Sequence, residues 1–263
     1  MNTSPHMNVI IRAARAAGRE AMMFFTRRHE LTVESKGKND FVTLADTTVE
    51  KEIIRHLHKA YPQYGVIAEE SSRKQIPPGW RWIVDPIDGT TNFIHGLPHF
   101  AISIALANDA EIHAAAVFNP ASDELFSAER GRGAFLNGQR IRSTQNHRLD
   151  QCLLATGFPV NKPAIVHRHM QTVEELLVGS RGIRRMGSAA LDLAFVAAGR
   201  YDGFWEPALH PWDIAAGVLL VTEAGGMVTD FVGTKKFLDS GNVLAASPQI
   251  HRILLETIQP AWA

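Results

Sequence analysis

Residues 82–93 bring two carboxylates next to a glycine-containing turn. A buried strand is expected to lead to Asp85, Pro86 stiffens the following loop, and Asp88 comes three residues later. Residues 89–91 can present backbone N–H groups to an anion, as a turn or a helix start does. Such a pattern suits a divalent cation that bridges the protein and a phosphate. An Asx turn at a strand end explains the same residues, so this run alone leaves both interpretations open.

Further acidic residues lie where a strand is expected to end or a helix to begin. Glu69 and Glu70 close a short strand, and for Glu70 a solvated strand end fits as well as any functional role. Asp46 and Asp213 each fall near the expected N-terminus of a helix, where a carboxylate caps free N–H groups and stabilises the helix dipole. Spacing alone does not separate capping from catalysis at either position.

The elements that must position these acids can be read from apolar periodicity. Helices are expected over residues 7–27 and from Asp46 to before Pro62, followed by strands at 65–68 and 80–84. Between about residues 100 and 141 the pattern changes to strands joined by turns, with runs at 101–107, 114–118 and 124–128, and with Asn137-Gly138 as a hairpin signal. The N-terminal half therefore predicts helices packed on a largely antiparallel sheet.

After about residue 150 the expected strands and helices alternate. The predicted strands are 152–156, 228–231 and 243–246, and the predicted helices are 166–178, 188–198, 213–224 and a last one that begins at Ser247-Pro248. Together the two halves predict an α/β protein, α+β in its first half and α/β in its second, with a seam near residue 150.

Bulk properties narrow the class of protein. The chain has 263 residues, of which 45% are apolar and 21% charged, as in an ordinary globular protein. Lys plus Arg and Asp plus Glu each total 27, and this neutral balance lacks the basic excess of nucleic-acid-binding proteins. We find no apolar stretch of about 20 residues and no secretory signal, so no membrane association is expected. The lone Cys152, expected to be a buried thiol, fits a reducing compartment and thus a cytoplasmic protein.

The acidic motifs taken together resemble the inositol monophosphatase family. The resemblance extends from about residue 7 to 255, and its signatures are, in order, residues 40–43 with Asp46, Glu69-Glu70, residues 85–93 and residues 212–217. Residues 97–104, 155–159 and 187–193 are most similar to bacterial inositol-1-monophosphatases. Several motifs in the family's order are far more specific than any one of them alone.

This resemblance implies a layered αβαβα sandwich of the sugar-phosphatase type. It implies a single domain over residues 1–263, with sub-layers at about 1–150 and 151–263, and usually a homodimer. It also implies Mg²⁺ as the cofactor, lithium sensitivity, and two or three ions per site. The weaker third ion would share Glu69, with residues 36–40 nearby.

The same resemblance assigns ligands to the two principal ions. Glu69, Asp85 and the backbone carbonyl of Ile87 would hold the first, and Asp85, Asp88 and Asp213 the second. All these ligands are hard oxygens, without Cys or His, which favours Mg²⁺ over Zn²⁺. One ion would lower the pKa of the attacking water and the other would stabilise the leaving oxygen, so no covalent intermediate is needed.

The resemblance further places the phosphate on residues 88–90, against the N–H groups of Gly89 and Thr90. The Thr90 hydroxyl and Asp46 would form a dyad that orients the attacking water. Asp213 would also position a water that protonates the leaving alkoxide.

On the leaving-alcohol side, the Glu206 carboxylate and the backbone of Ala189 would hold hydroxyls of a polyol. A carboxylate at 206 suits vicinal hydroxyls better than a second phosphate, which favours inositol 1-phosphate. Related enzymes hydrolyse fructose 1,6-bisphosphate, histidinol phosphate or adenosine 3′,5′-bisphosphate, and these substrates stay open.

A function of another class also stays open. Bacterial relatives that resemble this chain act as accessory proteins in transcription antitermination, as partners of elongation factors. The neutral charge disfavours direct nucleic-acid binding but allows recruitment through a protein. Arg181, Arg184 and Arg185 form a basic cluster that fits a solvated face or a dimer edge better than a contact for an acidic partner.

Overall fold

The computed structural model describes residues 3–30, 33–37, 40–71, 78–109, 111–159 and 162–262, with the backbone alone for residues 30, 33–37 and 40–42. Two short 3₁₀ helices, Arg28–Glu30 and Leu149–Gln151, occur in addition to the elements below. The loop at residues 36–40, expected beside a third ion, lies in part outside the described residues, because 38 and 39 are not among them.

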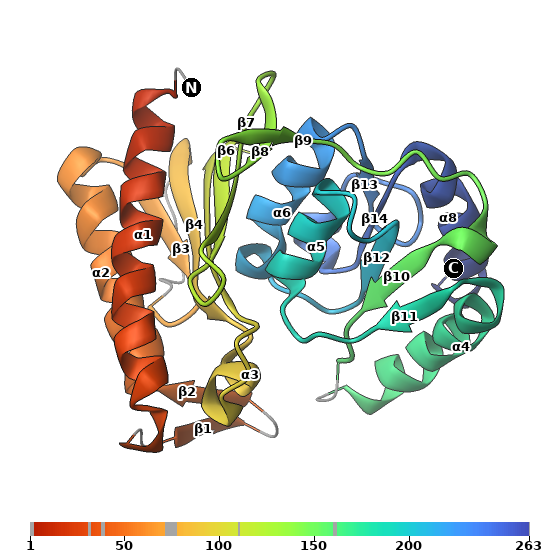
Figure 1. Ribbon diagram of the computed structural model, residues 1–263, viewed down its shortest axis with the longest axis horizontal. Coiled ribbons are helices and arrows are strands. Elements are labelled where there is room, and N and C mark those ends of the chain that lie inside the picture. Colours follow the sequence, from red (N-terminus) through yellow and green to blue (C-terminus); the bar gives the residue numbers. More distant parts are fainter. Residues whose placement is uncertain are drawn as a thin grey trace.

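Three helical layers alternate with two β-sheets (Figure 1). The helices are α1 (Pro5–Thr26) and α2 (Leu44–Ala60) on the outer face of the first sheet, α5 (Ala189–Ala197) and α6 (Pro211–Glu223) between the sheets, and α4 (Pro163–Gly179) and α8 (Pro248–Trp262) on the outer face of the second sheet. This arrangement confirms the predicted αβαβα sandwich.

The first sheet has seven strands that neighbour one another in chain order. They are β3 (Gly65–Ala68), β4 (Trp80–Asp88), β5 (Ala101–Asn108), β6 (Glu111–Asn119), β7 (Glu124–Glu129), β8 (Gly133–Leu136) and β9 (Gln139–Ile141). Only the β3–β4 pair is parallel among these strands, so the sheet is largely antiparallel, as predicted. Asn137 and Gly138 join β8 to β9 with φ angles of 46° and 84°, the left-handed pair that a two-residue hairpin turn requires.

The second sheet has five strands in the order β11-β10-β12-β14-β13. They are β10 (Leu153–Thr156), β11 (Gly182–Arg184), β12 (Gly203–Glu206), β13 (Met227–Thr229) and β14 (Val243–Ala246). β10 runs parallel to both β11 and β12, whereas the pairs formed by β14 are antiparallel. The chain passes from the first sheet to the second between Ile141 and Leu153, near the predicted seam; the single-domain assignment stays a prediction.

Several elements differ from the sequence-based expectation. The strand predicted over 228–231 ends at Thr229, because the Asp230 carboxylate accepts the N–H groups of Val232 and Thr234 and closes a turn. The helix predicted to begin at Asp213 begins two residues earlier, at Pro211. The elements that were not predicted are short: β1 (Val33–Gly37), β2 (Asp40–Thr43), α3 (Thr90–His95), β11, β12 and α7 (Phe237–Ser240).

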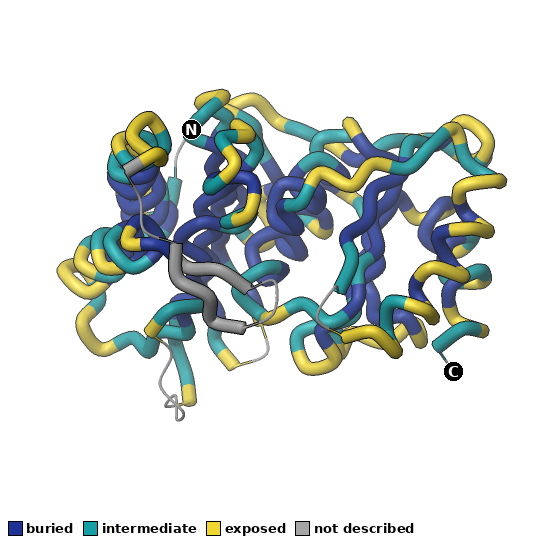
Figure 2. Tube along the Cα trace, turned by 90° about the horizontal axis from the view of Figure 1, so that it is seen from below, coloured by how far each residue is buried: buried dark blue, intermediate teal, exposed yellow. Residues whose placement is uncertain are grey.

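Burial follows the layers. Figure 2 shows buried residues along the strands and the central helices, with exposed residues on the outer sides of the outer helices. Between the sheets, α5 and α6 approach closely because Gly217 has no side chain: a Cβ there would overlap the Cβ of Leu193. No described helix has both the length and the apolar character needed to cross a bilayer.

We expect Gly217→Ala to destabilise the protein by about 1–3 kcal/mol, since the added methyl overpacks the contact between α5 and α6. Thermal unfolding should show a lower Tm, by about 2–4 °C for each kcal/mol. Thr222→Ala, at an exposed position of the same helix, is the control and should change stability by less than about 0.5 kcal/mol. Equal stability of wild type and Gly217→Ala would show that the helices can separate at no cost.

Candidate active site

A β-bulge in β4 sets the directions of the first two carboxylates. Asp85 pairs with Ser103 and Asp88 with Ala101, so β4 uses one residue more than β5 over this stretch. Cross-strand partners share a face, and Ala101 and Ser103 lie two residues apart, so Asp85 and Asp88 point to the same face of the sheet. That face looks toward α6, since the Ser103 hydroxyl donates a hydrogen bond to the carbonyl of Trp212 at 3.3 Å.

Asp85 is almost fully buried, with 1% of its surface exposed. Its Oδ1 accepts the backbone N–H of Ile87 at 3.0 Å, which fixes the carboxylate inside the bulge. Burial raises the pKa of Asp85 well above its usual range, and the charges of Glu69, Asp88 and Asp213 raise it further. The carboxyl group therefore lies in surroundings with an excess of negative charge.

Asp88 links the first sheet to the central helices. Its Oδ2 accepts the Ser188 hydroxyl at 2.6 Å and the Ala190 N–H at 2.7 Å, so it lies against the N-terminus of α5. Burial and the charge of Asp213 raise the pKa of Asp88 to about 7, although the hydrogen bonds from Ser188 and Ala190 oppose the shift. Helix amides and a like charge therefore act on one carboxylate in opposite directions.

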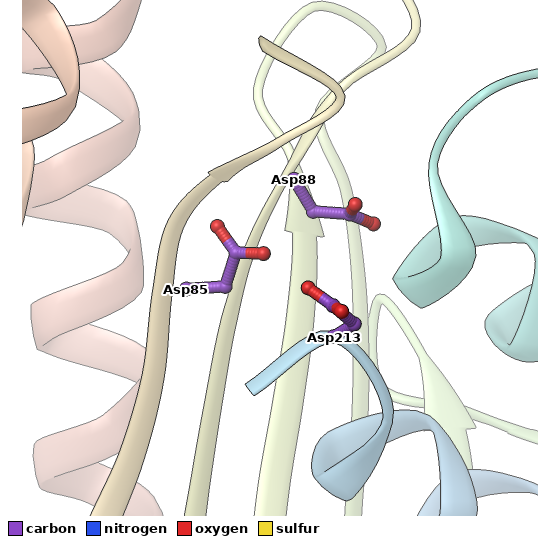
Figure 3. A group of neighbouring side chains, drawn as sticks. All are labelled: Asp85, Asp88 and Asp213. Atoms are coloured by element: carbon purple, nitrogen blue, oxygen red, sulfur yellow. The ribbon is translucent and has the colours of Figure 1, made fainter. Parts of the chain in front are cut away.

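Asp213 caps a helix and also lies beside the other acids, the two roles that the sequence could not separate. It is the third residue of α6 and caps that helix, since its Oδ2 accepts the backbone N–H of His210 at 2.7 Å. It also faces the two aspartates of β4: one oxygen of each of Asp85, Asp88 and Asp213 lies within 4.8 Å of the others. Figure 3 shows these three carboxyl groups directed into a common space, two from the strand and one from the helix start.

Asp46 and Thr90, the two residues of the dyad that the resemblance implies, are in contact. The Thr90 hydroxyl lies within hydrogen-bonding distance of Asp46 Oδ1, at 3.3 Å, and of the carbonyl of Ile87, at 3.1 Å. The other oxygen of Asp46 accepts both the N–H and the hydroxyl of Thr43 at 2.8 Å, which forms a capping box at the start of α2. Asp46 therefore caps its helix and holds Thr90 at once.

Glu69 and Gly89 lie at the edges of the group. Glu69 follows β3, where its N–H donates to the carbonyl of Val84 at 3.3 Å, and its charge acts on Asp85. Gly89 precedes α3 with φ of 99°, and a Cβ there would lie 3.1 Å from the carbonyl oxygen of Gly187, so only glycine fits without strain. The N–H groups of Gly89 and Thr90 thus belong to a helix start, where amides lack partners within the helix.

Glu206 and Ala189 lie on the side of the second sheet. Ala189 is the first residue of α5, and Glu206 ends β12. Burial raises the pKa of Glu206 to about 8; the charge of Arg185 lowers it, and the charges of Asp213 and Asp88 raise it. Glu206 therefore belongs to the same electrostatic environment as the acids of β4 and α6.

Four residues that act on the site were not assigned to it from the sequence. Thr43 and Ser188 hold Asp46 and Asp88, and their signal was the ordinary one of an N-cap residue. Gly157 leaves room for the Glu206 carboxyl group, which a Cβ at 157 would overlap. Asp192 is an acid within an apolar helix and is 1% exposed. Among the described residues its Oδ1 has no hydrogen-bond partner, and burial raises its pKa well above its usual range.

The cysteine prediction is confirmed. Cys152 is fully buried, and its thiol donates to the carbonyl of Arg148 at 3.1 Å. Burial raises the pKa of the thiol to about 12, so the reactive thiolate is suppressed.

The donor set fits a hard divalent cation. Asp85, Asp88 and Asp213 offer carboxylate oxygens, which Mg²⁺ and Ca²⁺ prefer. Burial raises the pKa of Asp85 and Asp88, and repulsion from neighbouring carboxylates raises it further. A bound cation would reverse that repulsion.

A five-layer αβαβα sandwich with carboxylates clustered at the end of one strand and the start of one helix is the arrangement of a sugar-phosphatase type of hydrolase. The sequence matches the profile of the inositol monophosphatase family over residues 2–263. The chain belongs to the inositol monophosphatase family, and this membership supports phosphatase activity for the protein.

Individual relatives carry two kinds of name. An "Inositol-1-monophosphatase" of Rhizobium meliloti is 46% identical over 260 residues, covering 98% of each chain. A "Nus factor SuhB" of Pseudomonas aeruginosa is 44% identical over 261 residues, covering 97% of this chain and 96% of that protein. Among solved structures, the extragenic suppressor protein suhB of Bartonella henselae aligns with a TM-score of 0.93 at 44% identity, covering 97% of this chain and 99% of that one.

Without metal, the protein should lose stability as pH rises. The folded-state pKa values of Asp88 and Glu206, about 7 and about 8, exceed their ordinary values of 3.8 and 4.5. Their contribution is fully present below the ordinary values and is lost as pH rises through the raised ones. In EDTA we therefore expect Tm to fall between about pH 5 and about pH 9, and Mg²⁺ to restore it at the alkaline end.

Asp85→Asn removes one of the repelling charges and keeps the oxygen that accepts the Ile87 N–H. In EDTA at alkaline pH, this variant should melt above wild type and gain less from Mg²⁺. Asp123→Asn, an exposed acid in a turn, is the control and should behave as wild type. A flat Tm across this pH range in EDTA would contradict the raised pKa values of Asp88 and Glu206.

Proposed function

We propose that the protein hydrolyses a small phosphate monoester with Mg²⁺, and that inositol 1-phosphate is its substrate. The observation that carries the proposal is the convergence of Asp85, Asp88 and Asp213 in a chain of the inositol monophosphatase family. The inositol-1-monophosphatase name of the Rhizobium relative supports the substrate. The family resemblance adds a cytoplasmic homodimer to the proposal.

Five residues would hold two Mg²⁺ ions. Glu69, Asp85 and the backbone carbonyl of Ile87 would hold the first ion. Asp85, Asp88 and Asp213 would hold the second. When bound, the ions would neutralise phosphate charge and lower the pKa of the attacking water. A third, weaker ion near Glu69 and sensitivity to lithium belong to the same proposal.

Thr90 and Asp46 would orient and deprotonate the attacking water. The Thr90 hydroxyl can give its proton to Asp46 Oδ1, which lies 3.3 Å away, while Thr90 Oγ1 accepts a proton from the water. The proton thus moves from the water to Thr90 and from Thr90 to the carboxylate. Thr43, through its two bonds to the other oxygen of Asp46, keeps that carboxylate in place.

The phosphate would rest on the N–H groups of Gly89 and Thr90, at the start of α3. On the leaving side, Asp213 would position the water that protonates the departing alkoxide. The backbone of Ala189 and the carboxyl group of Glu206 would bind hydroxyls of the alcohol.

Asp85→Asn should lower kcat by at least about a hundredfold, since a carboxylate shared by both cation positions is lost. Phosphate release from inositol 1-phosphate, measured with and without Mg²⁺, checks this, and Asp123→Asn should keep wild-type activity. Near-normal turnover of Asp85→Asn in excess Mg²⁺ would refute the assignment of the site.

The same assay with fructose 1,6-bisphosphate, histidinol phosphate and adenosine 3′,5′-bisphosphate tests the substrate. We expect the highest kcat/KM with inositol 1-phosphate. A higher value with any other member of the panel would replace the substrate and leave the phosphatase chemistry in place.

A second function is favoured by the relatives named Nus factor SuhB, from Pseudomonas aeruginosa and Escherichia coli at 44% identity each. We propose an association with transcription elongation factors through protein contacts. Co-purification with those factors should be retained by Asp85→Asn, because the contact surface would lie outside the site. Absence of co-purification with the wild-type protein would remove this function, whereas loss only in the variant would connect it to the active site.

A further inference from the structure

Three parallel strands of the second sheet end side by side at the leaving-alcohol side of the site. β11 is followed by Arg185, β10 by Gly157 and Phe158, and β12 ends at Glu206. The register pairs Ala155 with Arg184 across one boundary and residue 156 with residue 205 across the other. Arg185 and Glu206 therefore flank the end of β10, at the carboxyl edge where α/β sheets bind ligands.

The two residues that follow β10, Gly157 and Phe158, contact Glu206 and Arg185 respectively. Gly157 makes room for the Glu206 carboxyl group, since a Cβ there would overlap it. The Arg185 guanidinium lies over the ring of Phe158, 5.9 Å from its centroid. An aromatic face attracts a guanidinium and restricts its motion. Gly157 and Phe158, consecutive in one loop, therefore help to position the carboxyl group of Glu206 and the guanidinium of Arg185.

Arg185 also contacts the segment that binds Asp88. Its guanidinium lies where a Cβ on Gly187 would be, and the next residue, Ser188, donates to Asp88 at 2.6 Å. The guanidinium therefore lies beside the segment whose Ser188 holds Asp88. Within the described part of the chain, Arg185 has no ion-pair partner, although its positive charge acts on both Glu206 and Asp192.

The neighbouring arginine differs. Arg184 is the last residue of β11, and its Nη1 donates to the carbonyl of Ile183 at 3.3 Å. Successive strand residues point to opposite faces, so Arg184 and Arg185 leave the strand in different directions. The basic cluster predicted as a solvated face or dimer edge therefore has one member, Arg185, at the site.

We propose that Arg185 determines substrate specificity by donating hydrogen bonds to acceptor oxygens at the non-reacting end of the leaving alcohol, opposite Glu206. This inference rests on the proposed phosphatase function. The guanidinium carries five N–H donors in a rigid plane, which suits either several hydroxyl oxygens or a second phosphate. Arg185 would strengthen substrate binding and leave the reacting phosphate to the residues around Asp85.

Steady-state kinetics of wild type, Arg185→Gln and Arg185→Lys test the inference, with Arg184→Gln as the matched control. Inositol 1-phosphate and fructose 1,6-bisphosphate serve as substrates. Inorganic phosphate serves as a competitive inhibitor that lacks the leaving alcohol. We expect Arg185→Gln to raise KM by about tenfold, as the loss of one charge-assisted contact does, with kcat within about twofold. Arg185→Lys should recover part of the affinity, and the inhibition constant of phosphate should stay unchanged.

The kinetic results distinguish which oxygens Arg185 binds from the absence of any role in binding. A rise in KM for both substrates supports binding of hydroxyl and phosphate oxygens alike, and a rise for the bisphosphate alone supports binding of a second anion. The inference is overturned if Arg185→Gln leaves both KM values unchanged, weakens inorganic phosphate equally, or has the same effect as Arg184→Gln. A wild-type protein that hydrolyses neither substrate would overturn the proposed function and this inference together.

Discussion

The burial of several carboxylates close together, which costs their hydration and makes them repel one another, is the constraint on which this site depends. Asp46 and Asp213 lie in the first turns of α2 and α6, and the Asp88 carboxylate of β4 lies against the N-terminus of α5. There the amides without helical partners and the positive end of the dipole compensate part of the negative charge. Burial and the charges of the other carboxylates nevertheless raise the pKa of Asp85 and Asp88. The scaffold thus holds the acids together while leaving a net attraction for cations.

The geometry of the site follows from how one strand and two helices meet. The bulge in β4 turns Asp85 and Asp88 to the same face, which a regular strand would not do for residues three apart. Asp88 then reaches the N-terminus of α5, and Gly217 allows α6, which carries Asp213, to pack closely against α5. The position of each carboxylate therefore depends on packing between the layers as well as on its own loop.

The second sheet contributes a chemically different half. Its parallel strands β11 and β10 are followed by Arg185 and Gly157, and β12 ends at Glu206, whose pKa the charges of Asp213 and Asp88 raise. With a pKa of about 8, the Glu206 carboxyl group is largely protonated at neutral pH and can donate as well as accept a hydrogen bond. The sequence-based argument that a charged carboxylate disfavours a second phosphate is weakened by this burial.

Apolar periodicity is a local property, so the sequence by itself determined the α/β class and most long elements. The order of its acidic motifs indicated the layered sandwich and the candidate acids through the family resemblance. It could not distinguish capping from catalysis at Asp46 and Asp213, and the tertiary structure shows that each carboxylate caps its helix and also faces the site. Short elements such as β12, with four residues, lack a periodic signal and form through pairing with distant strands. The raised pKa values, the Gly157–Glu206 contact and the place of Arg185 depend on residues far apart in the chain, so only the folded structure decided them.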